Sequence, residues 1–143
     1  MNAGTDTNSP ALAANPPPST RCGIDTVEIA RIEKLLRDTA PEDLRRFFSE
    51  QEIADAGEGP GRAASLAARF AAKEAVSKCF TTGIGTEFGW KSASVYHGSR
   101  HEPLVRLDAQ GEALLAHVGA THVMLTLSHT ENYAMAVAAL VRA

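Results

Sequence analysis

The sequence predicts an α+β fold, in which an antiparallel sheet packs against one long central helix accompanied by shorter helices. Three observations support this. A helical pattern with a continuous apolar stripe covers residues 63–80. Strand-like segments lie on both sides of that pattern, at 22–27 before it and at 90–97 after it. Residues 122–141 consist of two apolar segments around a polar turn, which is typical of a β-hairpin.

Length and composition indicate one domain without a nucleic-acid or membrane partner. The chain has 143 residues, of which 44% are hydrophobic and 22% charged, and a formal net charge of -3. Proteins that bind nucleic acid or membrane surfaces are usually basic. No segment is long and apolar enough to span a bilayer, and the start lacks a secretory leader pattern, so we expect a cytoplasmic protein. Cys22 and Cys79 lack metal-ligand spacing and are expected to be buried, free thiols.

Residues 1–20 are expected to be a disordered tail, and residues 21–143 to form the domain. The first segment is rich in Ala, Pro, Asn, Ser and Thr, and Asp6 is its only charged side chain. Its three consecutive prolines favour an extended polyproline conformation. The pattern changes sharply at Arg21, where the folded part is predicted to begin.

The domain is predicted to begin with a strand and a helix. Residues 22–27 form the strand, whose end delivers Asp25, and a helix with an apolar stripe follows from about Glu28. Pro41 interrupts this pattern, and a short helical turn comes after it. Ser49 with the glutamate three residues later matches a capping box, which predicts the start of another short helix.

The second half is predicted to contain the long helix and two hairpins. A glycine-rich loop at 57–61 precedes the helix, and Gly83 or Gly85 is expected to supply the left-handed residue that ends it. The strand at 90–97 turns and returns at 104–107. A helix capped by Asp108 then continues to about Val118, and the C-terminal hairpin follows.

One position of the long helix carries a carboxylate where an apolar residue is expected. Glu74 follows Phe70 by four residues and Ala67 by seven, which places it on the apolar stripe. A carboxylate directed toward a core needs a cation, a hydrogen-bond donor or a metal. Lys78 lies one turn later on the same face, but such a helical pair contributes only about 0.2–0.5 kcal/mol. A divalent metal is therefore the stronger candidate.

Asp25 is the second candidate ligand for the same metal. It lies where a strand ends, a position typical of functional residues, although capping of the next helix would also explain it. Mg²⁺ commonly binds one or two carboxylates together with substrate phosphates and water, which Asp25 and Glu74 could supply. Lys78 could then make a charge-assisted contact of about 1.5–3 kcal/mol with a bound phosphate.

Other polar residues have weaker signals. Arg69 and Lys73 share a helix face and are equally compatible with a solvated surface and with an anion site. His129 follows an apolar strand and is either a ligand-binding group or a half-buried structural histidine. His97 and His101 have the spacing of a helical zinc pair, but the residues around them argue against a helix.

Basic residues recur on the helix after Asp25. Arg31, Lys34 and Arg37 follow one another at helical spacing, with acidic residues between them. The pattern indicates either a solvated face or a docking strip for an acidic partner, which would steer association more than strengthen it.

Three segments together resemble the holo-[acyl-carrier-protein] synthase family of phosphopantetheinyl transferases, in its short trimeric form. They are residues 23–32, residues 69–78 with the adjoining Thr82 to Gly85, and residues 127–130. Their order and spacing agree with the family across about residues 22–141. The resemblance implies a 4′-phosphopantetheinyl transferase fold and a homotrimer with the coenzyme at subunit interfaces.

The resemblance also implies a reaction. Such enzymes transfer the 4′-phosphopantetheine arm of coenzyme A to a serine of an apo acyl carrier protein and release adenosine 3′,5′-bisphosphate, with fatty acid biosynthesis as one setting. Asp25 and Glu74 would hold Mg²⁺ against the pyrophosphate of coenzyme A. Lys78 would contact the phosphates and offset charge on the leaving group. Glu74 or a metal-bound water would take the serine proton, and the sequence leaves both possibilities open.

Further roles follow from the same resemblance. Arg69 and His129, with Thr130, would face the nucleotide and its 3′-phosphate, and Gly83 would lie in a substrate-binding loop. Arg31, with Lys34 beside it, would meet the acidic carrier.

The chain departs from the family at two places. Thr81 stands where relatives often have glycine, and threonine tolerates a positive φ poorly, so we expect the loop 81–85 to run differently. Asp38 dilutes the basic strip. A non-catalytic module that binds coenzyme A or a carrier protein is the alternative function, and a metal-dependent phosphate-ester hydrolase is a third.

Overall fold

The computed structural model describes residues 21–143, and the predicted tail lies outside the described residues. In chain order the elements are β1 (Cys22–Glu28), α2 (Ile29–Asp38), the 3-10 helix η2 (Pro41–Arg46), α3 (Glu50–Ala56), α4 (Arg62–Cys79), β2 (Ala93–His97), β3 (Pro103–Leu107), α5 (Ala109–His117), β4 (His122–His129) and β5 (Tyr133–Val141). The predicted α+β fold is confirmed. No helix among these residues combines the length and apolarity needed to cross a membrane.

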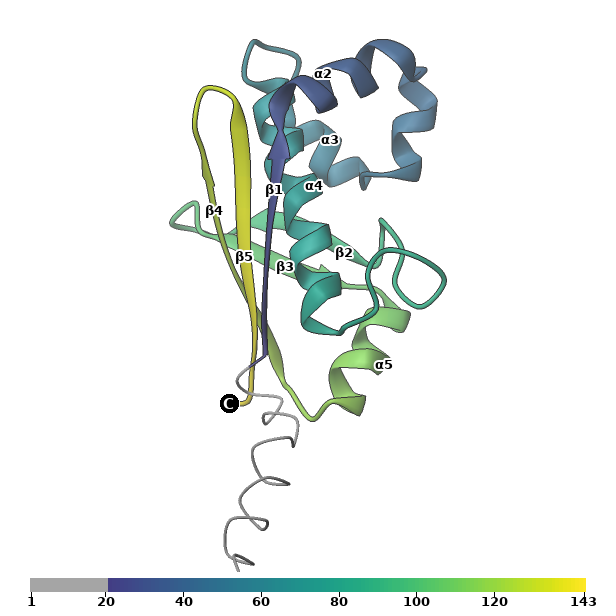
Figure 1. Cartoon of the computed structure of the whole chain (residues 1–143), viewed down its shortest axis with the longest axis vertical. Coiled ribbons are helices and arrows are strands. Elements are labelled where there is room, and N and C mark those ends of the chain that lie inside the picture. Colours follow the sequence, from purple (N-terminus) through teal and green to yellow (C-terminus); the bar gives the residue numbers. More distant parts are fainter. Residues whose placement is uncertain (1–20) are drawn as a thin grey trace, which may run out of the picture.

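The strands form two antiparallel sheets around α4. One has three strands in the order β1-β5-β4, and the other is the β2-β3 hairpin. Figure 1 shows the three-stranded sheet along one side of α4, with α2 and α3 gathered at one end of that helix and α5 at the other. Because β1 and β4 both pair with β5, the two ends of the described chain belong to the same sheet.

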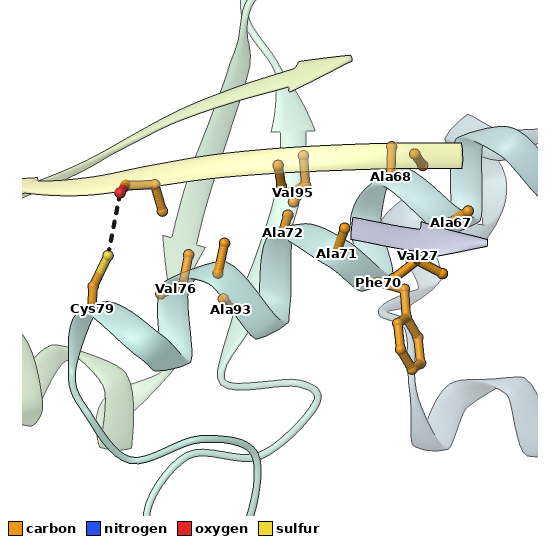
Figure 2. Close-up of a cluster of buried hydrophobic side chains, with 14 of the residues drawn as sticks. Val27, Ala67, Ala68, Phe70, Ala71, Ala72, Val76, Cys79, Ala93 and Val95 are labelled. Carbon is orange, nitrogen blue, oxygen red and sulfur yellow. Dashed lines mark hydrogen bonds between the residues drawn. The ribbon is translucent and has the colours of Figure 1, made fainter. Parts of the chain in front are cut away.

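Small side chains let α4 approach the sheet closely. The inward face of β5 presents Ala134, Ala136 and Ala138, and all three are buried. The facing side of α4 is also rich in alanine, as Figure 2 shows. At the C-terminal end of α4, the Cys79 thiol donates a hydrogen bond of 3.4 Å to the carbonyl of Ala138. This apolar packing is the main source of the stability of α4, as for most protein helices.

Two helices begin at the capping residues predicted from the sequence. Ser49 caps α3, its hydroxyl accepts from the Glu52 backbone, and the Glu52 carboxylate accepts from the Ser49 backbone at 2.9 Å, which completes the capping box. Asp108 caps α5 through a hydrogen bond of 2.8 Å from the backbone of Gly111.

Three details differ from the sequence predictions. Asp25 lies in the middle of β1, opposite Ala136, because the strand continues to Glu28. Helix α4 is ended by a left-handed Thr81, with φ of 62°, and Gly83 adopts φ of 64° two residues later. The left-handed position at the C-terminal end of α4 is therefore occupied by a threonine, which has less backbone conformational freedom than glycine. Both cysteines are free thiols, but Cys22 is exposed because it points away from α4.

Candidate active site

A glycine brings β1 into close contact with α4. A Cβ atom at Gly23 would overlap the backbone carbonyl oxygen of Ala75 and would lie 3.0 Å from the Cβ of Lys78. Only a residue without a side chain fits between the strand and the helix at this point. Side chains alternate along β1, so Asp25, two residues later, also faces α4.

This close approach brings together three charged side chains predicted as site residues. The ammonium of Lys78 donates to the Asp25 carboxylate at 3.2 Å and to the carbonyl of Ile24 at 2.8 Å. The Asp25 side chain is 18% exposed, while the Lys78 side chain is 50% exposed and reaches solvent. The cluster is thus a surface feature with its carboxylate partly sheltered.

Glu74 is the third member of the cluster, because its carboxylate interacts electrostatically with Asp25 and Lys78. Partial burial raises the pKa of the Glu74 carboxyl, and the neighbouring negative charge of Asp25 raises it further. Lys78 and Arg31 act in the opposite direction. Two carboxylates that repel each other at a partly solvated surface favour a bound cation, which fits the expected metal pair.

Two expectations about this cluster need correction. Glu74 is half-buried rather than in the core, because its side of α4 lies at the edge of the contact with β1. Lys78 pairs with Asp25 and not with Glu74 among the described residues. Within residues 21–143, no group of three or more potential metal ligands gathers, so any metal here has at most two carboxylates from this chain.

A separate cavity of about 750 Å³ lies on another side of α4. Its walls come from α3, the first half of α4, the β2-β3 hairpin and the end of β4. The lining residues are Gln51, Asp55, Gly61, Ala64, Ser65, Ala68, Arg69, Tyr96, His97, His101, Arg106, Leu127, Ser128 and His129.

Arg69 is the buried cation of this cavity. Its side chain is 3% exposed, which excludes the solvated surface, one of the two alternatives that the sequence left open. The guanidinium donates to the hydroxyl of Ser65 and, at 3.1 Å, to its carbonyl. Its Nε atom is buried and has no hydrogen-bond partner among the described residues. Burial lowers the pKa of Arg69, and the charges of Glu52 and Asp55 oppose that shift.

The sequence reasoning missed part of the cavity wall. Tyr96, His97, His101 and Arg106 belong to the β2-β3 hairpin, and the Arg106 guanidinium lies 4.5 Å from the centre of the Tyr96 ring. Strand alternation was an available signal for Tyr96 and Arg106, which share one face of the hairpin, but not for His97 or for His101 in the turn.

Lys73 lies neither on a solvated surface nor in the wall of the cavity. Its side chain is completely buried, and its ammonium donates to Glu52 at 2.8 Å and to the carbonyl of Ala93 at 2.6 Å. The other oxygen of Glu52 accepts from the backbone of Val95 at 2.9 Å. Burial lowers the pKa of Lys73, and the Glu52 carboxylate opposes that shift. The pair joins α3, α4 and β2.

The remaining predicted residues are spread over three places. His129 lines the cavity, whereas the neighbouring Thr130 uses its hydroxyl to accept from the backbone of Tyr133 at 3.2 Å and closes the β4-β5 turn. Gly83 lies in the loop after α4 and lines neither the cavity nor the carboxylate cluster. In this chain Asp25, Glu74 and Lys78 do not share the cavity of Arg69 and His129.

The basic strip of α2 borders an aromatic groove. The Arg31 guanidinium lies 5.1 Å from the centre of the Phe70 ring, and Phe47 and Trp90 complete the groove with apolar side chains. Lys34 is exposed and pairs with Asp38 at 2.7 Å, which confirms that Asp38 neutralises part of the strip.

Comparisons with known proteins agree with this architecture. Residues 21–138 match the model of the 4′-phosphopantetheinyl transferase superfamily. The holo-[acyl-carrier-protein] synthase of Chlamydia trachomatis serovar L2 is 42% identical over 116 residues, which cover 81% of this chain and 94% of that protein. The crystal structure of the Helicobacter pylori holo-[acyl-carrier-protein] synthase in complex with coenzyme A superposes with a TM-score of 0.74, at 31% identity, over 83% of this chain and 98% of that one. A holo-(acyl-carrier-protein) synthase structure from Bacillus anthracis in complex with CoA (3′,5′-ADP) gives a TM-score of 0.71, at 31% identity, over 87% and 97% of the two chains.

Proposed function

The chain belongs to the 4′-phosphopantetheinyl transferase superfamily, and we propose that it transfers the 4′-phosphopantetheine arm of coenzyme A to a serine of an apo acyl carrier protein. One observation carries the proposal within this chain: two repelling carboxylates and one solvent-accessible ammonium meet where β1 crosses α4. Such a cluster suits a diphosphate with its cation. We place the reaction in fatty acid biosynthesis in the cytoplasm.

Asp25 and Glu74 are the residues that hold Mg²⁺ in this proposal. Oxygen donors are what Mg²⁺ prefers, and one or two carboxylates are a common protein contribution to its coordination. The raised pKa of Glu74 supports the fit, because a cation would relieve the repulsion that raises it. When bound, the ion would neutralise charge on the diphosphate of coenzyme A.

Lys78 stabilises the leaving group. Its ammonium is fixed by Asp25 and the carbonyl of Ile24, and half of the side chain faces solvent, where a phosphate can reach it. Phosphoryl-type transfer depends mostly on positioning and charge neutralisation, which a fixed ammonium provides as adenosine 3′,5′-bisphosphate leaves. Glu74, or a water bound to the metal, would take the proton of the carrier serine.

The cavity of Arg69 and His129 holds the nucleotide and its 3′-phosphate. The Arg69 guanidinium brings a positive charge to the wall of this cavity, and guanidinium groups form strong charge-assisted hydrogen bonds with phosphates. Thr130 orients His129 by closing the turn next to it, and Gly83 shapes the loop after α4. The carrier docks at α2, where Arg31 and Lys34 lie beside the aromatic groove.

We propose a homotrimer, the assembly that the family resemblance implies, and two features of the chain support contact with another copy. The outer face of the three-stranded sheet exposes Ile24 and Met124, each 60% exposed, and Val137, which is 41% exposed. Ile24 pairs with Val137 in the β1-β5 register, so these side chains form one apolar patch. The carboxylate cluster and the Arg69 cavity are also separate in one chain, and a second copy can bring its cavity to the cluster of the first.

The central experiment measures transfer by intact-protein mass spectrometry. The purified protein with Mg²⁺ and coenzyme A should add one phosphopantetheine arm to an apo acyl carrier protein. Asp25→Asn and Glu74→Gln should each lower kcat/KM roughly 100-fold or more, whereas Glu112→Gln on exposed α5 should not. Coenzyme A binding without transfer to any of several carriers would support the binding module instead.

A mixing experiment tests the shared site. Glu74→Gln and an Arg69→Ala/His129→Ala double variant should each be inactive, and refolding them together should restore part of the activity, because some mixed interfaces combine intact halves. No recovery in mixtures shown by native mass spectrometry to contain both variants would overturn the shared site.

A further inference from the structure

A buried ion pair connects three of the elements that form the walls of the Arg69 cavity. The Glu52 carboxylate of α3 accepts from the Lys73 ammonium of α4 at 2.8 Å and from the backbone of Val95 in β2 at 2.9 Å. The same ammonium donates to the carbonyl of Ala93 in β2 at 2.6 Å. One pair of side chains thus holds α3, α4 and β2 together through buried hydrogen bonds.

The ion pair occupies one edge of β2. Residues two positions apart in a strand direct their backbone groups to the same edge, and β3 pairs with the opposite edge. The Ala93 carbonyl and the Val95 N–H would otherwise be buried without hydrogen-bond partners, which is costly. Glu52 and Lys73 satisfy both groups, so the ion pair takes the place of a neighbouring strand and fixes β2 to two helices.

Each point of attachment is close in the chain to a residue of the cavity wall. On α3 and β2 the wall residue is the direct neighbour of the attached residue, and on α4 it lies one helical turn before Lys73. These wall residues are Gln51 on α3, Tyr96 on β2 and Arg69 on α4. A displacement at the ion pair therefore moves the walls of the cavity relative to one another.

Arg69 itself is fixed only to its own helix by side-chain hydrogen bonds within the described chain. Its guanidinium donates to the hydroxyl and the carbonyl of Ser65, one turn earlier on α4. The contacts of Glu52 and Lys73 then help to determine how far α3 and β2 lie from that guanidinium. The Glu52 charge also opposes the fall in the pKa of Arg69 that burial causes, so this carboxylate acts on both buried cations.

We propose that Glu52 and Lys73 are positioning residues for the nucleotide, which hold the cavity walls on α3 and β2 at the spacing from Arg69 that a bound 3′-phosphate requires. This inference rests on the proposed function, since it assigns the nucleotide of coenzyme A to the Arg69 cavity. Ser94 supports the same spacing, because its hydroxyl lies 2.7 Å from that of Ser49 and joins β2 to the start of α3. Small displacements matter, since a misplacement of about 1 Å can slow an enzyme roughly 100-fold.

Steady-state transfer, followed by intact-protein mass spectrometry, separates coenzyme A binding from the other steps. In a Glu52→Gln/Lys73→Met double variant, the KM for coenzyme A should rise roughly tenfold or more, as expected when a charge-assisted contact with the phosphate is weakened. The kcat and the KM for the carrier should stay within about twofold, because only uniform binding of the nucleotide is lost. The variant removes one charge of each sign, so a change in net charge cannot explain the result.

Coenzyme A without its 3′-phosphate gives a readout that a loss of stability alone would not change. The unmodified protein should prefer coenzyme A over this analogue, measured as the ratio of the two kcat/KM values, and the double variant should lose about tenfold of that preference. Leu115→Ala is the matched control. It removes buried side-chain volume on α5, away from the cavity, and should lower stability without changing the preference. All proteins are compared below their unfolding temperatures.

Ser94→Ala decides the question if the double variant does not fold. It keeps the ion pair and removes only the contact with the Ser49 hydroxyl, so the KM for coenzyme A should rise about threefold and the KM for the carrier should not.

The outcomes distinguish this inference from the proposed function. An unchanged KM for coenzyme A and an unchanged preference in the folded double variant, or in Ser94→Ala if the double variant does not fold, would overturn the inference although transfer persists. Equal use of both coenzymes by the unmodified protein would overturn it too. If the unmodified protein modifies no carrier, the proposed function fails and the inference fails with it.

Discussion

Lys73 and Glu52 form an ion pair in which neither side chain is exposed, and the ammonium lies 2.8 Å from the carboxylate. Further hydrogen bonds compensate each charge. The Lys73 ammonium also donates to the carbonyl of Ala93, and the Glu52 carboxylate also accepts from the backbone N–H groups of Ser49 and Val95. A buried pair of this kind adds little net stability over apolar side chains, but removal of one partner leaves an uncompensated charge.

Lys73→Met should therefore lower the free energy of unfolding by about 3–5 kcal/mol, measured by urea denaturation. The Glu52→Gln/Lys73→Met double variant should be less destabilised than the sum of the single variants, because it removes both charges. Lys34→Met is the matched control. Its pair with Asp38 is exposed on α2, so its loss should leave the free energy of unfolding nearly unchanged. Equal losses for the two lysine variants would contradict the role of the buried pair.

The raised pKa of Glu74 predicts a pH-dependent effect of Mg²⁺. The folded state holds the Glu74 proton more tightly than the unfolded chain does, so ionised Glu74 lowers stability, and this loss appears as the pH rises above the ordinary glutamate value of 4.5. A bound cation should offset it. Addition of Mg²⁺ at ten times its Kd should raise stability by about 1.4 kcal/mol at neutral pH and by less near pH 4.5, as measured by thermal unfolding. Glu74→Gln should abolish the increase, whereas Glu112→Gln should keep it.

Gly23→Ala should disturb the contact between β1 and α4. The added methyl group would overlap the Ala75 carbonyl oxygen, so strand and helix must move apart at a cost of about 1–3 kcal/mol. The shift also separates Asp25 from Glu74, so the apparent affinity for Mg²⁺ should fall. Gly59→Ala serves as the control, because a Cβ atom there meets nothing within 4 Å. Unfolding and metal titration of both variants would test this prediction, and an unchanged Mg²⁺ affinity in folded Gly23→Ala would contradict it.

Thr81→Gly should stabilise the protein. Thr81 ends α4 with φ of 62°, which threonine adopts with strain and glycine without it. The net gain should be about 0.5–1 kcal/mol, seen as a higher urea midpoint. Thr86→Gly, in the same exposed loop but without a positive φ, should give no gain, and a stabilisation of both variants would point to a different cause.

Much of this fold could be predicted because its signals are local. The capping box at Ser49, the cap at Asp108 and the C-terminal hairpin depend on neighbouring residues, and all three are present as expected. For the end of α4, the sequence analysis considered only glycines as the left-handed residue. Thr81 takes the left-handed position expected of glycine, and its hydrogen bonds are local, from its backbone to the carbonyl of Lys78 and from its hydroxyl to the carbonyl of Phe80.

The site was harder to predict because α4 is surrounded by protein on several sides. Helical spacing correctly placed Glu74 and Lys78 on one face, but it could not show that the face of Arg69 and Lys73 is also buried. Glu52 was identified only as part of a capping box, since its pairing with Lys73 joins residues 21 positions apart. The separation of the Arg69 cavity from Asp25 likewise depends on the three-dimensional arrangement.

The overlap at position 23 also limits how this protein can evolve. The obstructing oxygen belongs to the main chain of Ala75, and every amino acid at that position would carry the same atom. No replacement of residue 75 can therefore make room for a side chain at position 23. A genetic suppressor of a Gly23 variant would have to lie elsewhere, among residues whose change tilts the whole helix away from the strand.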